Sequence, residues 1–583
     1  MSTEIVPTTP LDVTAPDPYG WLEEVEAPEA LAWAMERSAE TAVALGNLDD
    51  LTTDLARVLD SDERIATVEL IDGRYYNFWT DAAHPRGLWR RTTPESYVSA
   101  VPEWETLLDL DALSTETGVG YVWHGASIQR EPVNGVPYAR ALLALAPGGN
   151  DADVTREFDM LTLRFVPPEE GGFERAQAKG GLTWAGPDAV FVATDFGAGT
   201  TSTSGYPLVV KHWRRGTALT EAVTVYEGES DDMLVSAVRL TDPGHERDVV
   251  TRRTGFYSGH TYLLDGVGTD RQTLIRIEVP ETAEVGFHGP WLTLTLRDEW
   301  TVDGRTYAAG SLLVIDAAAF LGGERKFEVA FAPSGAVSLE THVWSANHLV
   351  LNLLDDVKSR LQVLTPPSAT AATGEWVPTD LSIGETDVSV QVSAVDSHDS
   401  DDLWVVTTGF LTAATLIRIS ATGGTPSVCK ATAALFDTTG LSVEQRFVTS
   451  ADGTRVPYWL VGRPEQLSGE LGPQPTLLWG YGGFEVAVPS AYNPVIGTAW
   501  LERGGVYAAA CIRGGGEYGP AWHQSALREN RHRCYEDFTA IAKALVAAGI
   551  TDRAHLGAQG RSNGGLLMGM MYTRYPELFG AIV

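Results

Sequence analysis

The chain has 583 residues, of which 44% are hydrophobic and 20% charged, and its formal net charge at pH 7 is −35. This length exceeds what a single hydrophobic core serves, so the sequence predicts a globular protein of two or more domains. The negative charge excludes a general nucleic-acid binder and argues against an anionic membrane surface as a partner, because phosphate groups would be repelled.

The N-terminal residues and the cysteines bear on the cellular compartment. The opening stretch MSTEIVPTTPLDVTAP has neither a basic n-region nor an apolar h-region, so we expect no signal peptide. No apolar run approaches the ~18 residues of a membrane span. The three cysteines, Cys429, Cys511 and Cys534, are odd in number and lack metal-site spacing. We therefore expect a cytoplasmic protein without disulfides.

Residues 1–71 form the first of three predicted regions. After a proline-rich start, the stretch PEALAWAMERSAETAVALGNL spaces its apolar residues, such as Leu31 and Met35, by about one helical turn. The stretch LTTDLARVLDS continues this pattern. The region is therefore predicted to be helical.

Residues 72–435 are predicted to be almost entirely β. Short runs such as GRYYNFW, AVFVATDF, SLLVIDA and HLVLNLL are bounded by Gly, Asp or Pro, and the only helical turn expected is at DAAAFLGG. A β-propeller arranges many short strands without long open edges, and at ~40–50 residues per blade the region holds about seven or eight blades. No strict sequence repeat supports this prediction, and two consecutive β-sandwiches are the alternative.

In residues 436–583 strands alternate with helices, which predicts a parallel sheet with crossover connections. The expected strands are TLLWGY, GVYAAACIR, HLGAQG and the final GAIV, and NGGLLMGMMYTRYP is an expected helix. In CYEDFTAIAKALVAAG, the residues Phe538, Ile541, Ala542 and Leu545 line one helical face. Gly549 follows where a C-terminal cap belongs.

Ser562 lies between the strand HLGAQG and the helix that follows it. The surrounding residues are Gly560, Arg561, Asn563 and Gly564. A serine at a sharp strand-to-helix turn between small residues is typical of a nucleophile elbow. The helix N-terminus would offer partial positive charge and free N–H groups to a developing oxyanion. A plain glycine-rich turn is the alternative, because G-x-S-x-G alone is a weak signal.

Two further glycine-rich loops follow expected strands, WGYGGF at 479–484 and RGGGEYG at 513–519. Sites in parallel sheets form at the carboxyl ends of strands, so the three loops are expected to converge on one pocket. A dinucleotide site at 479–484 is the weaker interpretation, because G-x-G-x-x-G is incomplete and no helix follows it.

Four stretches together resemble the prolyl oligopeptidase family of serine peptidases. They are DPYGWLEE at 17–24, WGYGGF at 479–484, IRGGGEYGPAWH at 512–523 and GRSNGGLL at 560–567. The resemblance implies an α/β-hydrolase domain, a parallel sheet with helices, built from both ends of the chain. A seven-bladed β-propeller would be inserted between them, and the N-terminal helices would pack on the hydrolase domain.

The resemblance also implies roles for individual residues. Ser562 matches the nucleophile. The Tyr481 hydroxyl and the backbone N–H of Asn563 match the oxyanion hole, and Phe484 matches an aromatic wall of the pocket for the residue before the scissile bond. The implied substrates are short peptides that the propeller admits while it excludes folded proteins. We expect a monomer that uses no cofactor and no metal.

The triad partners of Ser562 are missing from the sequence that follows it. In this fold the order is Ser, then Asp, then His, and no His or Asp occurs after Ser562. Upstream, His555 begins a strand and should point away from the site, and His523 is expected to be a surface or core residue. We therefore expect both partners beyond residue 583, a hydrolase domain truncated there, and no peptide turnover by residues 1–583 alone.

Other functions stay open on the sequence. A different serine hydrolase on the same fold could be an acylaminoacyl-peptidase, a basic-residue-specific oligopeptidase or an esterase. A non-catalytic propeller protein with a relic hydrolase segment is the third hypothesis. The preference for the cleaved residue is not determined by the motifs found here.

Overall fold

The structure, a computed structural model, describes residues 17–583 except 134, 270, 368–375 and 385–387. Two compact units make up the chain, Met1–Asp60 and Ser61–Val583. The first unit contains the predicted helices, with a 3-10 turn η1 (Gly20–Glu23) followed by α1 (Pro28–Leu45) and α2 (Asp49–Leu59). Within this unit the rings of Trp21 and Trp33 lie 6.3 Å apart, so η1 packs against α1.

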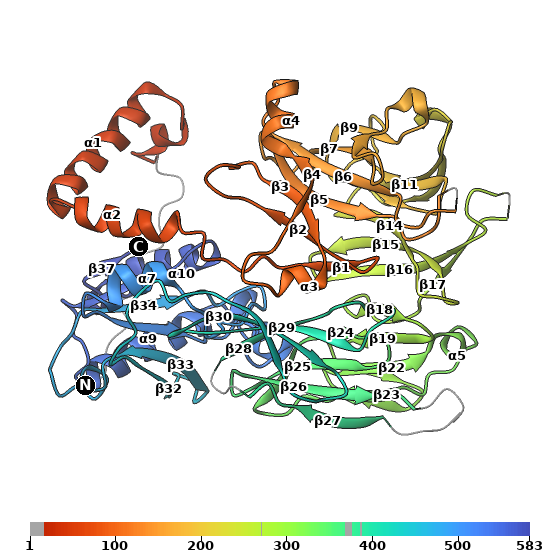
Figure 1. The fold of residues 1–583 in the computed structure, drawn as a ribbon. Helices are drawn as coiled ribbons and strands as arrows, with labels where there is room; N and C mark the ends of the chain where they lie inside the picture. The colour runs from red at the N-terminus through yellow and green to blue at the C-terminus, as the bar shows by residue number, and fades with distance from the viewer. Residues whose placement is uncertain (1–16, 134, 270, 368–375, 385–387) are drawn as a thin grey trace. The chain divides into compact units, whose positions relative to one another are not determined.

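Residues 69–431 form the seven antiparallel blades of a β-propeller (Figure 1). The first three blades contain β1 (Glu69–Ile71), β2 (Arg74–Trp79), β3 (Leu88–Thr92) and β4 (Glu105–Asp109); β5 (Tyr121–Ile128), β6 (Arg140–Pro147), β7 (Asp153–Asp159), β8 (Arg164–Phe165) and β9 (Glu174–Ala178); and β10 (Gly181–Trp184), β11 (Ala189–Ala193), β12 (Val209–Arg214) and β13 (Val223–Glu227).

The remaining four blades follow the same up-and-down order. They contain β14 (Leu234–Leu240), β15 (Arg247–Gly255), β16 (Ser258–Asp265) and β17 (Thr273–Arg276); β18 (Glu284–His288), β19 (Trp291–Thr295), β22 (Leu312–Asp316) and β23 (Glu328–Phe331), with a separate hairpin β20 (Trp300–Val302) and β21 (Arg305–Tyr307); β24 (Val337–Trp344), β25 (Leu349–Asp355), β26 (Lys358–Thr365) and β27 (Val377–Leu381); and β28 (Ser389–Ala394), β29 (Asp402–Gly409), β30 (Thr412–Ser420) and β31 (Ser427–Ala431).

The ring closes by side-chain packing between the last blade and the first. Tyr75 of β2 packs on Trp404 of β29, with ring centroids 5.5 Å apart, and the Arg418 guanidinium donates to the Tyr75 hydroxyl at 3.2 Å. Buried apolar clusters likewise join each blade to the next around the ring. The propeller is therefore the correct interpretation of the β-rich region, and the two-sandwich alternative is wrong.

Besides the single turn α3 (Pro94–Tyr97), one longer helix in the propeller region was not predicted. The prediction allowed a helical turn only at DAAAFLGG, where α5 (Ala317–Leu321) lies, but α4 (Leu110–Thr117) follows β4 as well. The Asp109 carboxylate caps α4 by accepting from the Ala112 N–H at 2.9 Å, and Leu110 and Leu113 are buried. The cap signal was thus present in the sequence, but the helix is too short for its periodicity to stand out among strands.

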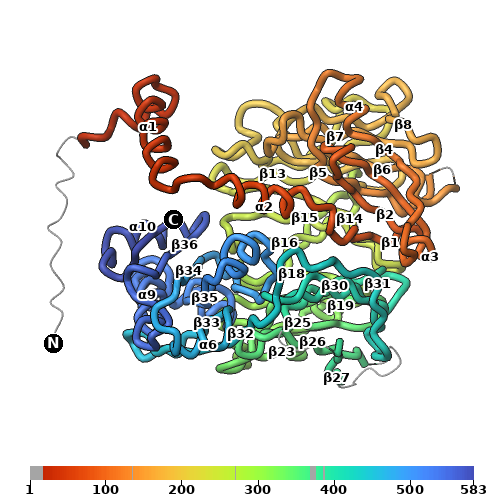
Figure 2. Tube along the Cα trace, turned by 60° about the vertical axis from the view of Figure 1, so that its left-hand side comes forward, coloured from red at the N-terminus to blue at the C-terminus, as the bar shows by residue number. Residues whose placement is uncertain are grey.

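The C-terminal part is a mixed sheet in the order β32-β33-β35-β34-β36-β37. Its strands are β32 (Ser442–Thr449), β33 (Arg455–Gly462), β34 (Thr476–Gly480), β35 (Val506–Ala510), β36 (Leu556–Gln559) and β37 (Ala581–Ile582). The four predicted strands run parallel, whereas β32 and β33 form an antiparallel hairpin at one edge that was not predicted. Figure 2 shows this blue segment beside the propeller strands.

Both predicted helices of this part are present. In α9 (His532–Ala547) the residues Phe538, Ile541 and Leu545 are fully buried against the sheet. Gly549 adopts φ 73°, and the N–H of the next residue, Ile550, bonds to the Leu545 carbonyl at 3.2 Å, which is a Schellman cap. The second helix is α10 (Asn563–Arg574).

The other helical elements are single turns in loops. They are α3 (Pro94–Tyr97), α6 (Pro464–Leu467), α7 (Pro494–Ile496), α8 (Pro520–Gln524), η2 (Pro168–Glu170), η3 (Leu219–Glu221), η4 (Gly497–Leu501), η5 (Arg528–Asn530) and η6 (Pro576–Leu578). None of the helices in the described ranges is long and apolar enough to cross a membrane.

Candidate active site

Ser562 sits at the turn between β36 and α10 in a strained backbone conformation. Its φ and ψ angles are 57° and −119°, a combination that non-glycine residues rarely adopt, and it occupies the N-cap position of α10. Its side chain does not cap the helix. Such a turn lifts the serine Oγ clear of the strand end, as in a nucleophile elbow.

Close backbone packing explains the glycines of the elbow. A Cβ on Gly560 would lie 2.3 Å from the Gly564 carbonyl oxygen, and one on Gly564 would lie 2.7 Å from the Gly480 carbonyl oxygen. Both contacts are with backbone atoms, which cannot move aside. The small residues that the sequence pattern singled out are therefore required by the fold of the turn.

The Asn563 side chain joins the elbow to the loop that carries Tyr481. Its Nδ2 donates to the Tyr481 carbonyl oxygen at 2.8 Å. The Arg531 guanidinium contacts both this loop and the elbow. Its Nη1 donates to the Gly482 carbonyl at 2.5 Å and its Nη2 to Asn563 Oδ1 at 3.2 Å. The backbone N–H of Asn563 makes no hydrogen bond within the described residues, so it is free to serve an oxyanion.

The two other glycine-rich loops also meet, as predicted. The Glu485 N–H donates to the Gly514 carbonyl at 3.2 Å, and a Cβ on Gly516 would lie 2.2 Å from the Glu485 carbonyl oxygen. Phe484, next in the chain to Glu485, is half-exposed, and its ring lies 5.4 Å from that of Phe256 in the propeller. The three strand-end loops therefore lie together at one edge of the sheet.

None of the twelve histidines, all of which lie in the described residues, is hydrogen-bonded to Ser562. His555 is exposed just before β36, whereas Ser562 follows the other end of that strand, and it pairs at 2.7 Å with Asp552. His523, in contrast, is buried, and its Nδ1 lies 3.1 Å from the Arg297 guanidinium of the propeller. Burial, helped by the charges of Arg297 and Arg531, lowers its pKa to about 4.

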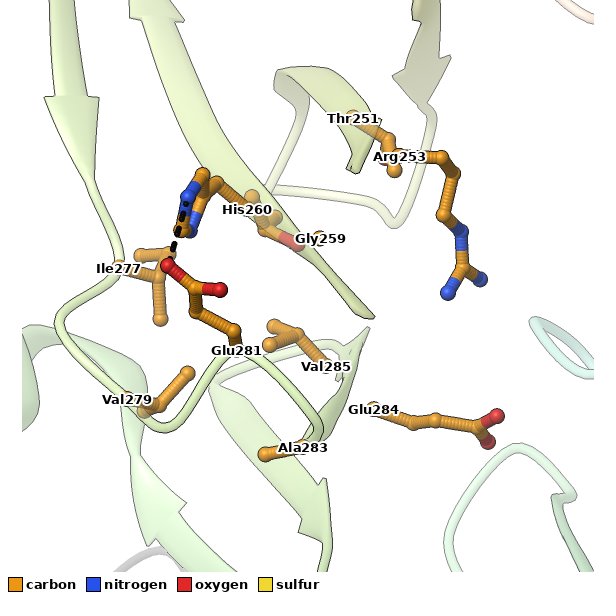
Figure 3. A pocket seen from close by; sticks show the side chains of 11 residues that line it. Thr251, Arg253, Gly259, His260, Ile277, Val279, Glu281, Ala283, Glu284 and Val285 are labelled. Atoms are coloured by element: carbon orange, nitrogen blue, oxygen red, sulfur yellow. Dashed lines mark ion pairs between the residues drawn. The ribbon is translucent and has the colours of Figure 1, made fainter. Parts of the chain in front are cut away.

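Two cavities lie near these elements. One of about 630 Å³ is next to the elbow and is lined by Gln559, Gly560 and Arg561 together with apolar residues. The other, of about 220 Å³, lies between the fourth and fifth blades (Figure 3). There the His260–Glu281 ion pair spans 3.2 Å, and Arg253 and Glu284 point away from it. Within the described residues no group of three or more His, Cys, Asp or Glu could hold a metal ion.

The fold and the elbow define an α/β-hydrolase sheet joined to a β-propeller. Residues 3–432 match the family description "Prolyl oligopeptidase, N-terminal beta-propeller domain", and residues 496–583 match "Prolyl oligopeptidase family". The chain therefore belongs to the prolyl oligopeptidase family and is a prolyl-oligopeptidase-like serine peptidase.

Individual relatives agree with this assignment. A protein of Sinorhizobium fredii described as "Uncharacterized peptidase y4nA" is 35% identical over 580 residues, which cover 98% of this chain and 77% of the relative. A prolyl endopeptidase of Elizabethkingia miricola is 36% identical over 177 residues, or 30% of this chain and 25% of that enzyme. The solved structure of a post-proline cleaving enzyme from Rickettsia typhi superposes with a TM-score of 0.86 at 28% identity, covering 96% of this chain and 81% of that one.

The sequence analysis singled out Ser562, Tyr481, Asn563 and Phe484 as candidate site residues, and it did not single out Arg531. This arginine lies just before α9, outside every glycine-rich motif. Nothing in its local sequence points to a role, because its two acceptors come from different loops. Only the folded chain brings them within reach of one guanidinium.

Proposed function

We propose that Ser562 is the nucleophile of an oligopeptidase that cleaves short peptides after proline through an acyl-enzyme. The observation that carries this proposal is the strained elbow at Ser562, followed directly by the Asn563 backbone N–H, which has no acceptor among the residues that the structure describes. The relatives from Elizabethkingia miricola and Rickettsia typhi are named for cleavage at proline, which supports the same preference here.

The oxyanion of the tetrahedral intermediate would be held by the Tyr481 hydroxyl and the Asn563 N–H. The bond from Asn563 Nδ2 to the Tyr481 carbonyl supports this assignment, because it ties the loop that carries Tyr481 to the elbow that carries the Asn563 N–H. Preorganised donors stabilise the developing charge without reorganising during the reaction. Phe484, with its half-exposed ring beside these loops, would form a wall of the pocket for the proline.

The serine needs a general base and a carboxylate that orients it. His523 is a poor candidate for the base because it already accepts a hydrogen bond from Arg297 and is buried against the propeller. His555 is engaged by Asp552. We therefore keep the prediction that the His and Asp of the triad come from outside residues 1–583, and that these residues alone do not turn over peptides.

The predicted division into residues 1–71, 72–435 and 436–583 also stays a proposal, as does the packing of the N-terminal helices on the hydrolase domain. The change from antiparallel blades to a mixed sheet between β31 and β32 supports the second boundary. A monomer in the cytoplasm is proposed as well. The three free cysteines, of which Cys511 and Cys534 are buried, support the reducing compartment.

Covalent labelling and peptide turnover test the proposed function. The full-length protein, meaning one that includes the triad partners expected outside residues 1–583, should react with a fluorophosphonate and hydrolyse a chromogenic peptide with proline before the scissile bond. Ser562→Ala should lose both activities, whereas the control Ser468→Ala, at an exposed helix end, should keep them. A preference for arginine or for acetylated substrates would favour the alternative peptidases. Turnover that persists in Ser562→Ala would refute the nucleophile assignment.

A further inference from the structure

The loop after β34 contains two adjacent residues in the left-handed region. Phe484 has φ 52° and Glu485 has φ 56°, although neither is glycine. Such conformations persist only where the surroundings impose them. Backbone contacts supply part of this restraint, since the Val486 N–H donates to the Gly483 carbonyl at 3.1 Å.

A propeller residue holds the same loop through the Glu485 side chain. Arg297, which lies between β19 and β20 of the fifth blade, forms an ion pair with the Glu485 carboxylate. The two side chains are only 12% and 19% exposed, so the pair is largely removed from water. Charge-assisted bonds of this kind are strong and directional, and removing one partner leaves the other charge buried.

Three further contacts fix the position of Arg297. Its guanidinium lies over the ring of Tyr257, 3.6 Å from the centroid, at the tip of the β15–β16 hairpin. Its Nη2 donates to the unprotonated Nδ1 of His523 at 3.1 Å. Its backbone carbonyl accepts from Gln524 Nε2 at 3.0 Å. The arginine is therefore anchored on both the propeller and the hydrolase sheet.

The contacts of Phe484 extend the same interface. Its ring meets Phe256, the neighbour of Tyr257 at the hairpin tip, with the ring planes inclined at 62°. The propeller thus touches the loop at two adjacent residues, by charge at Glu485 and by an aromatic edge at Phe484. Tyr481 lies only three residues before Phe484 on the same loop.

We propose that Arg297 is a positioning residue that makes the Phe484 wall of the substrate pocket depend on contact with the propeller. This inference rests on the proposed function of Phe484. Arg297 does not touch the reacting atoms. It acts through Glu485: the ion pair holds Phe484 and Glu485 in their left-handed conformations. The Phe484 ring is thereby kept in place for the residue before the scissile bond.

The test compares Arg297→Gln, Glu485→Gln and the double variant in the full-length protein, using peptides with proline or alanine before the scissile bond. Each single variant should raise KM for the proline peptide by about 10-fold or more, the usual effect of losing apolar pocket contacts. Fluorophosphonate labelling of Ser562 should continue, and kcat should change by less than about 3-fold. The preference for proline over alanine should fall, and the double variant should be no worse than either single one.

Two more variants separate this role from general damage. Arg297→Lys keeps the charge but not the planar fork, so its KM should lie between those of the wild type and Arg297→Gln. Arg305→Gln removes an arginine that lies over Tyr307 in the same blade, and it should leave the preference unchanged. Equal losses on both peptides, or additive effects in the double variant, would overturn the proposal. Loss of Ser562 labelling in the wild type would instead refute the proposed function.

Discussion

The stability of this protein should fall as pH rises because of one buried carboxyl group. Glu517, in the loop between β35 and α8, is fully buried. Its Oε1 accepts the Val488 N–H at 3.0 Å, so it links the loop at 513–519 to the chain beyond Phe484. The Trp522 indole lies near the carboxyl without reaching hydrogen-bond geometry. Burial raises the pKa of Glu517 to about 8, so the group is largely protonated at neutral pH.

The direction of the effect follows from the two pKa values. The unfolded chain has the ordinary value of 4.5, so the folded protein binds the proton more tightly. The contribution to stability is fully present below the unfolded value and is lost as pH rises through about 8. At 1.36 kcal/mol per pKa unit, the loss between about pH 5 and pH 9 is about 4 kcal/mol.

The variant Glu517→Gln mimics the protonated carboxyl and cannot ionise. The difference in free energy of unfolding between this variant and the wild type should shift by about 4 kcal/mol in favour of the variant between about pH 5 and pH 9. Urea denaturation of the full-length proteins, followed by tryptophan fluorescence, measures this difference. The exposed Glu470→Gln is the control and should show a constant difference. A constant difference for Glu517→Gln would show that Glu517 titrates normally in the fold and would refute the reasoning.

Three further predictions concern the elbow and the oxyanion hole of the full-length protein. Tyr481→Phe should fold normally but lower kcat by about 10²–10³-fold, the usual cost of one oxyanion donor, and unchanged turnover would remove this hydroxyl from the mechanism. Arg531→Met should lower kcat by about 10–10²-fold, because the two loops that carry the oxyanion donors would be misplaced, and Arg531→Lys should recover part of this loss. Steady-state kinetics with a proline peptide measure both variants, and values equal to the wild type in both would contradict the prediction. Gly560→Ala should abolish fluorophosphonate labelling and destabilise the sheet by about 1–3 kcal/mol, because its Cβ would lie 2.3 Å from a backbone oxygen. Gly565→Ala, which meets nothing within 4 Å, is its control, and equal labelling of the two variants would refute the steric argument.

The sequence by itself determined the elements whose signals are local. The buried face of α9 follows from the helical spacing of Phe538, Ile541 and Leu545, and its end follows from Gly549. The elbow follows from a strand, small residues around Ser562 and a helix. Periodicity and turn chemistry act over a few residues, so they can be recognised without the fold. The number of blades could be predicted approximately, because it depends on the length of the β-rich region and on how densely strands occur in it.

The tertiary structure decided the contacts between residues far apart in the chain. Arg297 and Glu485 are separated by 188 residues, and Asn563 and Tyr481 by 82. The surroundings of His523 also depended on such a contact, because His523 is hydrogen-bonded to Arg297 of the propeller and not to Ser562. These partners lie in loops, which have no periodic pattern, and each pairing is set by how blades and sheet pack together. A local sequence pattern therefore does not predict these pairings.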